Sequence, residues 1–160
     1  MEIINFEDKY AADFKDLNLE WLYKYNLAES HDLQVVNDPR GTIINRGGCI
    51  FLAKENETIA GTAALMKEHD GVYELAKMTV ANGFRGRGIS KLLMKRCLDE
   101  AKALGAKRLI LFSNHQLETA IQLYRKFGFK DIPVEVSPFE TADVKMELVL
   151  QPVPAWCNDK

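Results

Sequence analysis

The chain has 160 residues, which at about 150 residues per domain predicts a single domain over residues 1–160. Its 47% hydrophobic and 28% charged residues are typical of a globular protein, and 10 glycines and 5 prolines are too few for a disordered or fibrous chain. The net charge of −2 hides an asymmetry, because residues 1–80 carry 8 basic and 14 acidic side chains (−6), whereas residues 81–160 carry 13 and 9 (+4).

The first third of the chain is predicted to hold one strand and several helices. Apolar residues favour a strand within residues 1–6, and in the charged stretch 7–25 they recur at helical spacing. Ser30 is a candidate N-cap, and Asp38 with Pro39 marks a break in regular structure. One or two short helices are therefore expected between residues 27 and 48.

Three apolar runs then predict an antiparallel meander of strands. The first two are separated by a polar loop, and an Asp-Gly pair predicts a tight turn before the third. The predicted strands cover residues 49–54, 59–66 and 72–80.

The second half alternates helices with strands. An amphipathic helix over residues 88–104, about 25 Å long, is predicted to end at Gly105. The later elements are a buried strand over 108–114, a helix over 117–127 and a strand over 144–150, before Pro152 and Pro154 end regular structure. The order indicates an α/β fold whose mixed, mostly antiparallel central sheet is flanked by helices.

A glycine-rich basic segment links the third strand to the long helix. Residues 85–90 read Arg-Gly-Arg-Gly-Ile-Ser, and five cations without an acidic neighbour lie close together: Arg85, Arg87, Lys91, Lys95 and Arg96. Backbone N–H groups at a helix N-terminus point outward, and the helix dipole favours an anion there. The segment is therefore predicted to bind phosphate groups.

Two common phosphate-binding motifs do not fit this segment. A P-loop requires lysine and then Ser or Thr after its last glycine, but Ile89 and Ser90 follow Gly88. A dinucleotide-binding loop requires a small residue at Lys91 and a βαβ unit instead of an antiparallel meander. The remaining alternative is a glycine turn beside a solvated basic face, and the flanking sequence decides against it.

Three separated blocks resemble the GCN5-related N-acetyltransferase (GNAT) family. The segment Glu74-Leu-Ala-Lys-Met-Thr-Val80 stands where that family has its central strand, and Arg85 opens an Arg-x-x-Gly-x-small pyrophosphate loop. Asn114 precedes a helix that ends Ala120-Ile-Gln-Leu-Tyr124-Arg-Lys-Phe-Gly-Phe129. The resemblance covers about residues 49–150 and departs at Ser90, where the family usually has Gly or Ala, so a modest effect on cofactor affinity is expected.

The resemblance implies acetyl-CoA as the acetyl donor. The loop would bind its pyrophosphate through backbone N–H groups, and the central strand would splay from the next one and polarise the thioester carbonyl with its main chain. Arg87, Lys91 and Lys95 are spaced to screen the phosphates. The predicted cofactor-binding residues are Met78, Thr79, Val80, Arg85, Gly86, Arg87, Gly88, Ile89, Ser90, Asn114 and Tyr124.

The chemistry needs an acid and a base. Tyr124 matches the family tyrosine that faces the thioester sulfur, where its phenol would protonate the departing thiolate. Period-2 alternation predicts Glu74 on the strand face of Met78 and Val80, where it would accept the ammonium proton or only orient a cationic substrate. Cys97 lies inside a helix face, so direct transfer in a ternary complex is expected instead of an acyl-cysteine.

The predicted function is N-acetylation of a primary amine on a small molecule or peptide. Residues 7–48 would vary with the acceptor, and the candidate lining residues there are Trp21, Tyr25, Glu29 and His31. The alternatives are another acyl-CoA as donor, a CoA-binding regulator without transfer, and a nucleic-acid surface. The last would be unusual at a pI near 5.9.

Neither a membrane span nor a metal site is predicted. No apolar run approaches the roughly 18 residues that a span needs, and the acidic start does not read as a signal peptide, so a cytoplasmic protein is expected. Cys49, Cys97 and Cys157 are scattered and predict reduced thiols without metal-ligand spacing. The oligomeric state stays open between a monomer and a homodimer.

Overall fold

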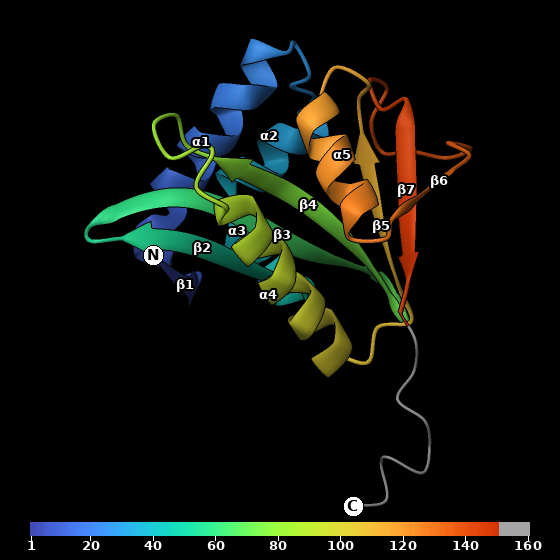
Figure 1. Ribbon diagram of the computed structural model, residues 1–160, viewed down its shortest axis with the longest axis horizontal. Coiled ribbons are helices and arrows are strands. Elements are labelled where there is room, and N and C mark those ends of the chain that lie inside the picture. Colours follow the sequence, from blue (N-terminus) through green and yellow to red (C-terminus); the bar gives the residue numbers. More distant parts are fainter. Residues whose placement is uncertain (151–160) are drawn as a thin grey trace, which may run out of the picture.

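The computed structural model describes residues 1–150 and contains a seven-stranded sheet with helices on both faces (Figure 1). The strand order is β1-β2-β3-β4-β5-β7-β6; β4 and β5 run parallel, and the other neighbouring pairs are antiparallel. This confirms the expected mixed sheet. In chain order the elements are β1 Glu2–Asn5, η1 Asp8–Tyr10, α1 Ala11–Lys24, α2 Ser30–Asn37, α3 Pro39–Thr42, η2 Ile44–Arg46, β2 Cys49–Glu55, β3 Thr58–His69, β4 Val72–Val80, α4 Ile89–Ala103, β5 Arg108–Ser113, α5 Glu118–Lys126, β6 Lys130–Ile132 and β7 Val144–Val149.

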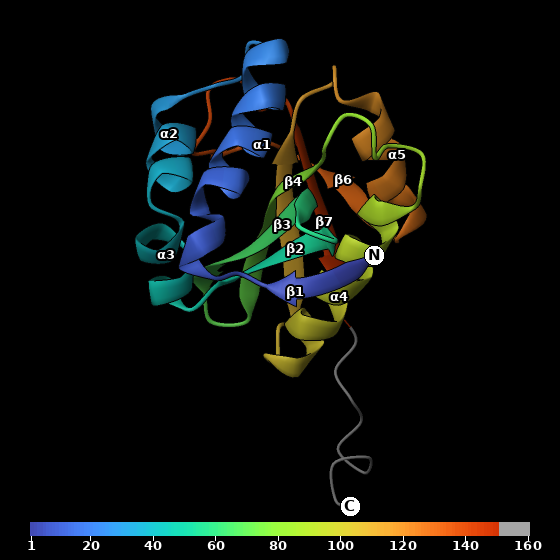
Figure 2. The ribbon, with the colours of Figure 1, turned by 90° about the vertical axis from the view of Figure 1, so that its left-hand side faces the viewer.

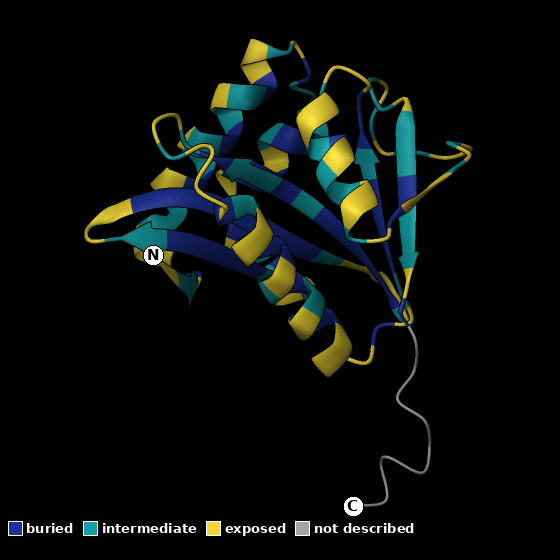
Figure 3. Cartoon of the chain, in the orientation of Figure 1, coloured by how far each residue is buried: buried dark blue, intermediate teal, exposed yellow. Residues whose placement is uncertain are grey.

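Helices cover the two faces of the sheet as separate layers. Figure 2 shows α1–α3 on one side and α4 and α5 on the other. Each side has its own core: Phe14, Val35 and Val36 pack on Ile50 and Leu52, whereas α4 packs on the opposite face. Figure 3 shows the resulting burial, with β2–β4 buried through much of their length and the outer faces of the helices exposed. None of the helices in residues 1–150 is both long and apolar enough to span a bilayer.

Two local predictions needed correction, and one short strand had not been predicted. Helix α2 begins at Ser30, so the N-cap is Glu29, whose N–H donates to Asp32 Oδ2 at 3.0 Å. The β2–β3 connection is shorter than predicted because both strands extend to within two residues of each other, with Asn56 in the left-handed region at φ +54°. The short strand β6 was not predicted, since Lys130–Ile132 has no apolar pattern, and Pro152 and Pro154 lie outside the described residues.

A β-bulge in β4 changes which face its side chains occupy. Ala64 pairs with Ala76 but Thr62 pairs with Thr79, so β4 has one extra residue here, and Lys77 adopts φ +52°. The expectation that Glu74 shares a strand face with Met78 and Val80 is therefore wrong. Met78 and Val80 pack into the core that also contains Tyr73 and Leu75, whereas Glu74 lines a cavity with Asp32 of α2.

The parallel pairing of β4 with β5 is short. It runs from Val72 with Arg108 to Glu74 with Ile110 and then stops. Beyond this point the two strands diverge (Figure 1). The splay that the family resemblance implied is thus present, and it opens the central sheet between β4 and β5.

Candidate active site

A cleft with a volume of about 620 Å³ occupies the opening between β4 and β5. Residues 75–80 of β4 form one wall, and residues of α5 and the segment before it form the other. The loop between β4 and α4 closes one end through Phe84, Arg85, Gly86 and Gly88. The cleft therefore runs from the diverging strands to the N-terminus of α4.

The loop at this end presents bare backbone to the cleft. Gly86 and Gly88 have φ values of +79° and +77°, and a Cβ at either position would meet no atom within 4 Å beyond the glycine and its two chain neighbours. Gly88 is the N-cap of α4, so the first N–H groups of this helix have no intrahelical acceptor. This arrangement is suited to an anion that needs close contact with main-chain donors.

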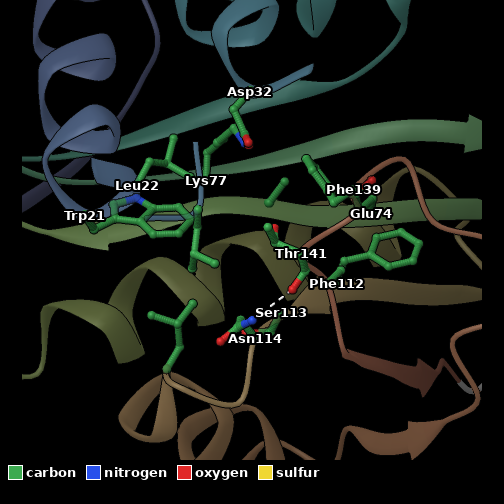
Figure 4. A pocket seen from close by; sticks show the side chains of 14 residues that line it. Trp21, Leu22, Asp32, Glu74, Lys77, Phe112, Ser113, Asn114, Phe139 and Thr141 are labelled. Atoms are coloured by element: carbon green, nitrogen blue, oxygen red, sulfur yellow. Dashed lines mark hydrogen bonds and ion pairs between the residues drawn. The ribbon is translucent and has the colours of Figure 1, made fainter. Parts of the chain in front are cut away.

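A second, smaller cavity of about 70 Å³ lies beside the cleft and is lined in part by residues of α1 and α2. Apolar residues dominate its walls, and in Figure 4 Trp21 and Phe139 lie on opposite sides of it. The two cavities share lining residues, which are Trp21, Ala76, Lys77, Phe112, Ser113 and Leu117. A group held in the small cavity therefore lies next to the cleft.

Three buried ionisable side chains meet at the small cavity. Lys77 Nζ donates to Asp32 Oδ1 at 2.5 Å, and both side chains are less than 5% exposed. Glu74 is also buried, and its desolvation, together with the nearby Glu68 carboxylate, raises its pKa to about 8, although Lys77 opposes the shift. Glu74 can therefore gain or lose a proton near neutral pH.

Hydrogen bonds hold the loop between β6 and β7 against this cavity. The Glu29 carboxylate accepts from Glu140 N–H at 2.8 Å, from Thr141 N–H at 3.2 Å and from the Thr141 hydroxyl at 2.5 Å. Desolvation raises the pKa of Glu29, but these hydrogen bonds lower it more, so the pKa lies below its ordinary value. Asn114 Nδ2 donates to the Thr141 carbonyl at 2.8 Å, the interaction dashed in Figure 4. These contacts hold Phe139 against the Lys77 ammonium, 5.5 Å from the ring centroid.

Comparison with known proteins identifies the family. The model of the acetyltransferase (GNAT) family matches residues 12–129. The chain belongs to the GNAT acetyltransferase family. It is 37% identical over 132 residues to an IAA acetyltransferase from Azospirillum brasilense, an alignment that covers 82% of this chain and 76% of that protein.

Solved GNAT structures share the fold. A GNAT acetyltransferase from Staphylococcus aureus matches with a TM-score of 0.85 and 22% identity, over 94% of this chain and 99% of that one. The yncA structure from Salmonella typhimurium, solved with its cofactor acetyl-CoA, matches with a TM-score of 0.73 and 19% identity, over 96% of both chains. The protein is thus an acetyl-CoA-dependent N-acetyltransferase of the GNAT family.

The cleft of this GNAT domain fits acetyl-CoA. The glycine backbone and the α4 N-terminus provide main-chain donors for a pyrophosphate, and Lys91 borders the same cavity. Of the residues predicted to bind the cofactor, those that line the cleft are Met78, Thr79, Val80, Arg85, Gly86, Gly88, Ile89, Ser90 and Tyr124.

Two predicted cofactor residues are placed elsewhere. The Arg87 guanidinium makes two hydrogen bonds to the Glu55 carboxylate, at 3.1 and 2.7 Å, and so turns to the β2–β3 hairpin. Asn114 lines the small cavity, where its Oδ1 accepts from Gln116 N–H at 3.0 Å while its Nδ2 holds Thr141. With these two hydrogen bonds Asn114 caps the end of β5, and the cofactor-binding roles of Asn114 and of the Arg87 main chain stay predictions. Lys95 does not line either cavity.

Tyr124 lines the cleft from α5. Its ring packs on Phe129, with the centroids 6.0 Å apart, and burial raises the pKa of the phenol to about 12. The hydroxyl is therefore protonated throughout the neutral range and can donate a proton or hydrogen bond into the cleft.

Several functional candidates were missed from the sequence. Asp32 and Phe139 lie in segments without a motif, and the fold alone brings them to Lys77. Lys77 did carry a signal, because a charged residue inside an apolar strand is rarely buried unless it is paired. Lys126, on the α5 side, adds a further cation to the cleft.

Proposed function

We propose that the protein transfers the acetyl group directly from acetyl-CoA to the primary amine of a small molecule, with both substrates bound together. The observation that carries this proposal is the shared wall between the two cavities at Ala76, Lys77 and Ser113. An amine in the small cavity, beside Glu74, would have access to a thioester in the cleft. Acetyl-CoA supplies the activated acetyl group.

Glu74 is proposed as the general base. An attacking ammonium must lose a proton, and a carboxylate with a pKa of about 8 is closer in basicity to an amine than an ordinary carboxylate is. Desolvation is the main cause of this raised pKa. Proton transfer from the amine nitrogen to Glu74, directly or through one water, therefore has a small free-energy gap.

Tyr124 and the β4 main chain are proposed to act on the donor side. The Tyr124 phenol would protonate the departing thiolate sulfur, which is a strong base until it gains that proton. The N–H of Met78 at the bulge would donate to the thioester carbonyl oxygen and stabilise negative charge there.

The cysteines support direct transfer. Cys97 is fully buried, and burial raises its pKa above the ordinary thiol value. Burial likewise raises the pKa of Cys49 to about 11. In the part of the chain that the structure describes, neither cysteine therefore offers the thiolate that an acyl-enzyme intermediate requires.

The small cavity favours a compact acceptor with an apolar body. Its volume of about 70 Å³ and its Trp21, Phe112 and Phe139 walls fit an amine of few heavy atoms better than a peptide chain. The Asp32 and Glu74 carboxylates would favour the cationic head of such an amine. The acceptor class can be tested by measuring CoA thiol release with a series of alkyl, arylalkyl and peptide amines.

Acetyl-CoA is expected to raise the melting temperature by about 5 to 10 °C when present at about 100 times its dissociation constant. Ligand linkage gives about 2.7 kcal/mol of stabilisation at that ratio. Differential scanning fluorimetry with acetyl-CoA and free CoA measures this, and ATP and NAD serve as controls. Equal shifts with all four ligands, or none at millimolar acetyl-CoA, would contradict the cleft assignment.

Initial-rate kinetics test the ternary complex. Direct transfer predicts intersecting double-reciprocal lines when both substrates are varied, because each substrate must be bound before either product leaves. Parallel lines would indicate a covalent acetyl-enzyme and would contradict the proposal.

A further inference from the structure

A buried chain of hydrogen bonds joins α1 to the bulge of β4. Trp21 Nε1 donates to Asn18 Oδ1 at 3.0 Å, and Asn18 Nδ2 donates to Thr62 Oγ1 at 3.2 Å. The Thr62 hydroxyl donates in turn to the main-chain oxygen of Lys77 at 2.7 Å. Asn18 and Thr62 are both fully buried. Trp21, Asn18 and Thr62 together form what we term the bulge relay.

The bulge depends on such contacts. Lys77 has a Cβ, and a left-handed φ of +52° is unfavourable for any residue that has one. Its carbonyl has left the regular β-ladder and finds its partner in Thr62. Its side chain is held by Asp32 of α2. The backbone and side chain of Lys77 are thus both fixed by polar contacts.

Fixing the Lys77 carbonyl also fixes the direction of the Met78 N–H. The two groups belong to one planar trans peptide, so they point in opposite directions. The Thr62 hydroxyl contacts Asn18 and therefore lies on the α1 face of the sheet. The Met78 N–H is directed away from that face, Met78 borders the cleft, and in the described residues it has no cross-strand partner in β3 or β5.

We propose that Thr62 and Asn18 are positioning residues for acetyl transfer. From the opposite face of the sheet, the bulge relay aims the Met78 N–H at the thioester carbonyl. This inference rests on the proposed function, in which that N–H polarises the carbonyl. The relay ends at Trp21, which lines both cavities, so it also connects the acceptor wall with the donor end of the site.

Two substitutions at Thr62 separate the effect of its hydroxyl from the effect of its side-chain shape. Thr62→Val removes the donor to Lys77 and is expected to lower kcat about tenfold, with the KM for acetyl-CoA changed less than about twofold. Thr62→Ser keeps the hydroxyl and is expected to retain most of the activity. Ile50→Val is the matched control, because Ile50 is buried on the same face outside the relay and the variant loses stability without losing a hydrogen bond.

A spectroscopic measurement needs no acceptor amine. The infrared carbonyl band of acetyl-CoA labelled with ¹³C at the thioester is expected to move to lower frequency on binding to the wild type and to Thr62→Ser. The movement should be at most half as large in Thr62→Val, because the Met78 N–H is no longer held in place.

The possible outcomes distinguish the proposed role of the β4 main chain from the proposed role of the bulge relay. No band movement in the wild type would contradict the role of the β4 main chain itself. A normal wild-type movement that Thr62→Val retains would overturn the relay alone. So would a loss of kcat in Thr62→Val that Ile50→Val reproduces at an equal loss of melting temperature.

Discussion

Glu74→Gln is expected to lower kcat at least about a hundredfold, because the amide cannot accept the ammonium proton. The substitution is nearly isosteric, so the KM for acetyl-CoA should change little. Steady-state thiol release at saturating acetyl-CoA measures this loss. A variant with more than a third of wild-type turnover would reduce Glu74 to an orienting role.

The pH profile gives this prediction a second readout. Because the base must be ionised and its pKa is about 8, wild-type kcat should fall as the pH drops below 8. Glu68→Gln is the matched control, since the exposed Glu68 carboxylate helps to raise the pKa of Glu74. That variant should keep its maximal rate and move the acidic limb to lower pH. An unmoved limb would assign the titration to another group.

Stability should change in the opposite sense to activity. Folding raises the pKa of Glu74 from 4.5 to about 8, so its contribution to stability is fully present below pH 4.5 and is lost as the pH rises through 8. Glutamine does not titrate. Relative to wild type, the free energy of unfolding of Glu74→Gln should therefore rise by about 4 kcal/mol between pH 5 and pH 9. This corresponds to a relative rise in melting temperature of about 10 °C. A difference in melting temperature that does not change with pH would show that folding does not raise the pKa of Glu74.

Tyr124→Phe is expected to lower kcat by about ten- to a hundredfold, because the thiolate would leave without a proton donor. The KM for acetyl-CoA should stay within about threefold, since the ring keeps its packing on Phe129. Burial places the pKa of Tyr124 at about 12, so the wild type should show no alkaline loss of an acid up to about pH 10.

The control for Tyr124 removes a hydroxyl elsewhere in the same protein. Tyr73→Phe changes a buried tyrosine of β4 that lines neither cavity, and it should leave kcat unchanged. Equal turnover in Tyr124→Phe and Tyr73→Phe would show that Tyr124 serves only in packing. Stopped-flow measurement of thiol release would separate this chemical step from product release.

The donor half of the site could be predicted from the sequence because its determinants are local. Gly86 and Gly88 are close in sequence to the N-terminus of α4. Tyr124 is spaced along the sequence with the apolar residues of its own helix, α5. The order of strands and helices followed from hydrophobic periodicity, which is strong in β2–β4 and α4. The short polar strand β6 lacked such a signal.

The acceptor half depends on contacts between distant segments. Asp32 and Lys77 are 45 residues apart, and no spacing rule joins them. The bulge at Lys77 was not predictable either, because a lysine has an intrinsic preference against φ +52° and only tertiary contacts hold it there. That single residue moved Glu74 to the opposite face from Met78. The contact of the Arg87 guanidinium with Glu55 could not be predicted for a similar reason, since Glu55 lies on the distant β2–β3 hairpin.

The Glu29 contacts to Glu140 and Thr141 have a consequence for re-engineering the acceptor preference. They join a segment near the start of the chain to one near its end, and these two segments supply much of the wall of the small cavity. The cleft for the donor is built largely from residues 75–126. On the proposed assignment of the two cavities, exchanging the flanking segments as a pair is expected to change the amine preference while the central residues keep the donor site.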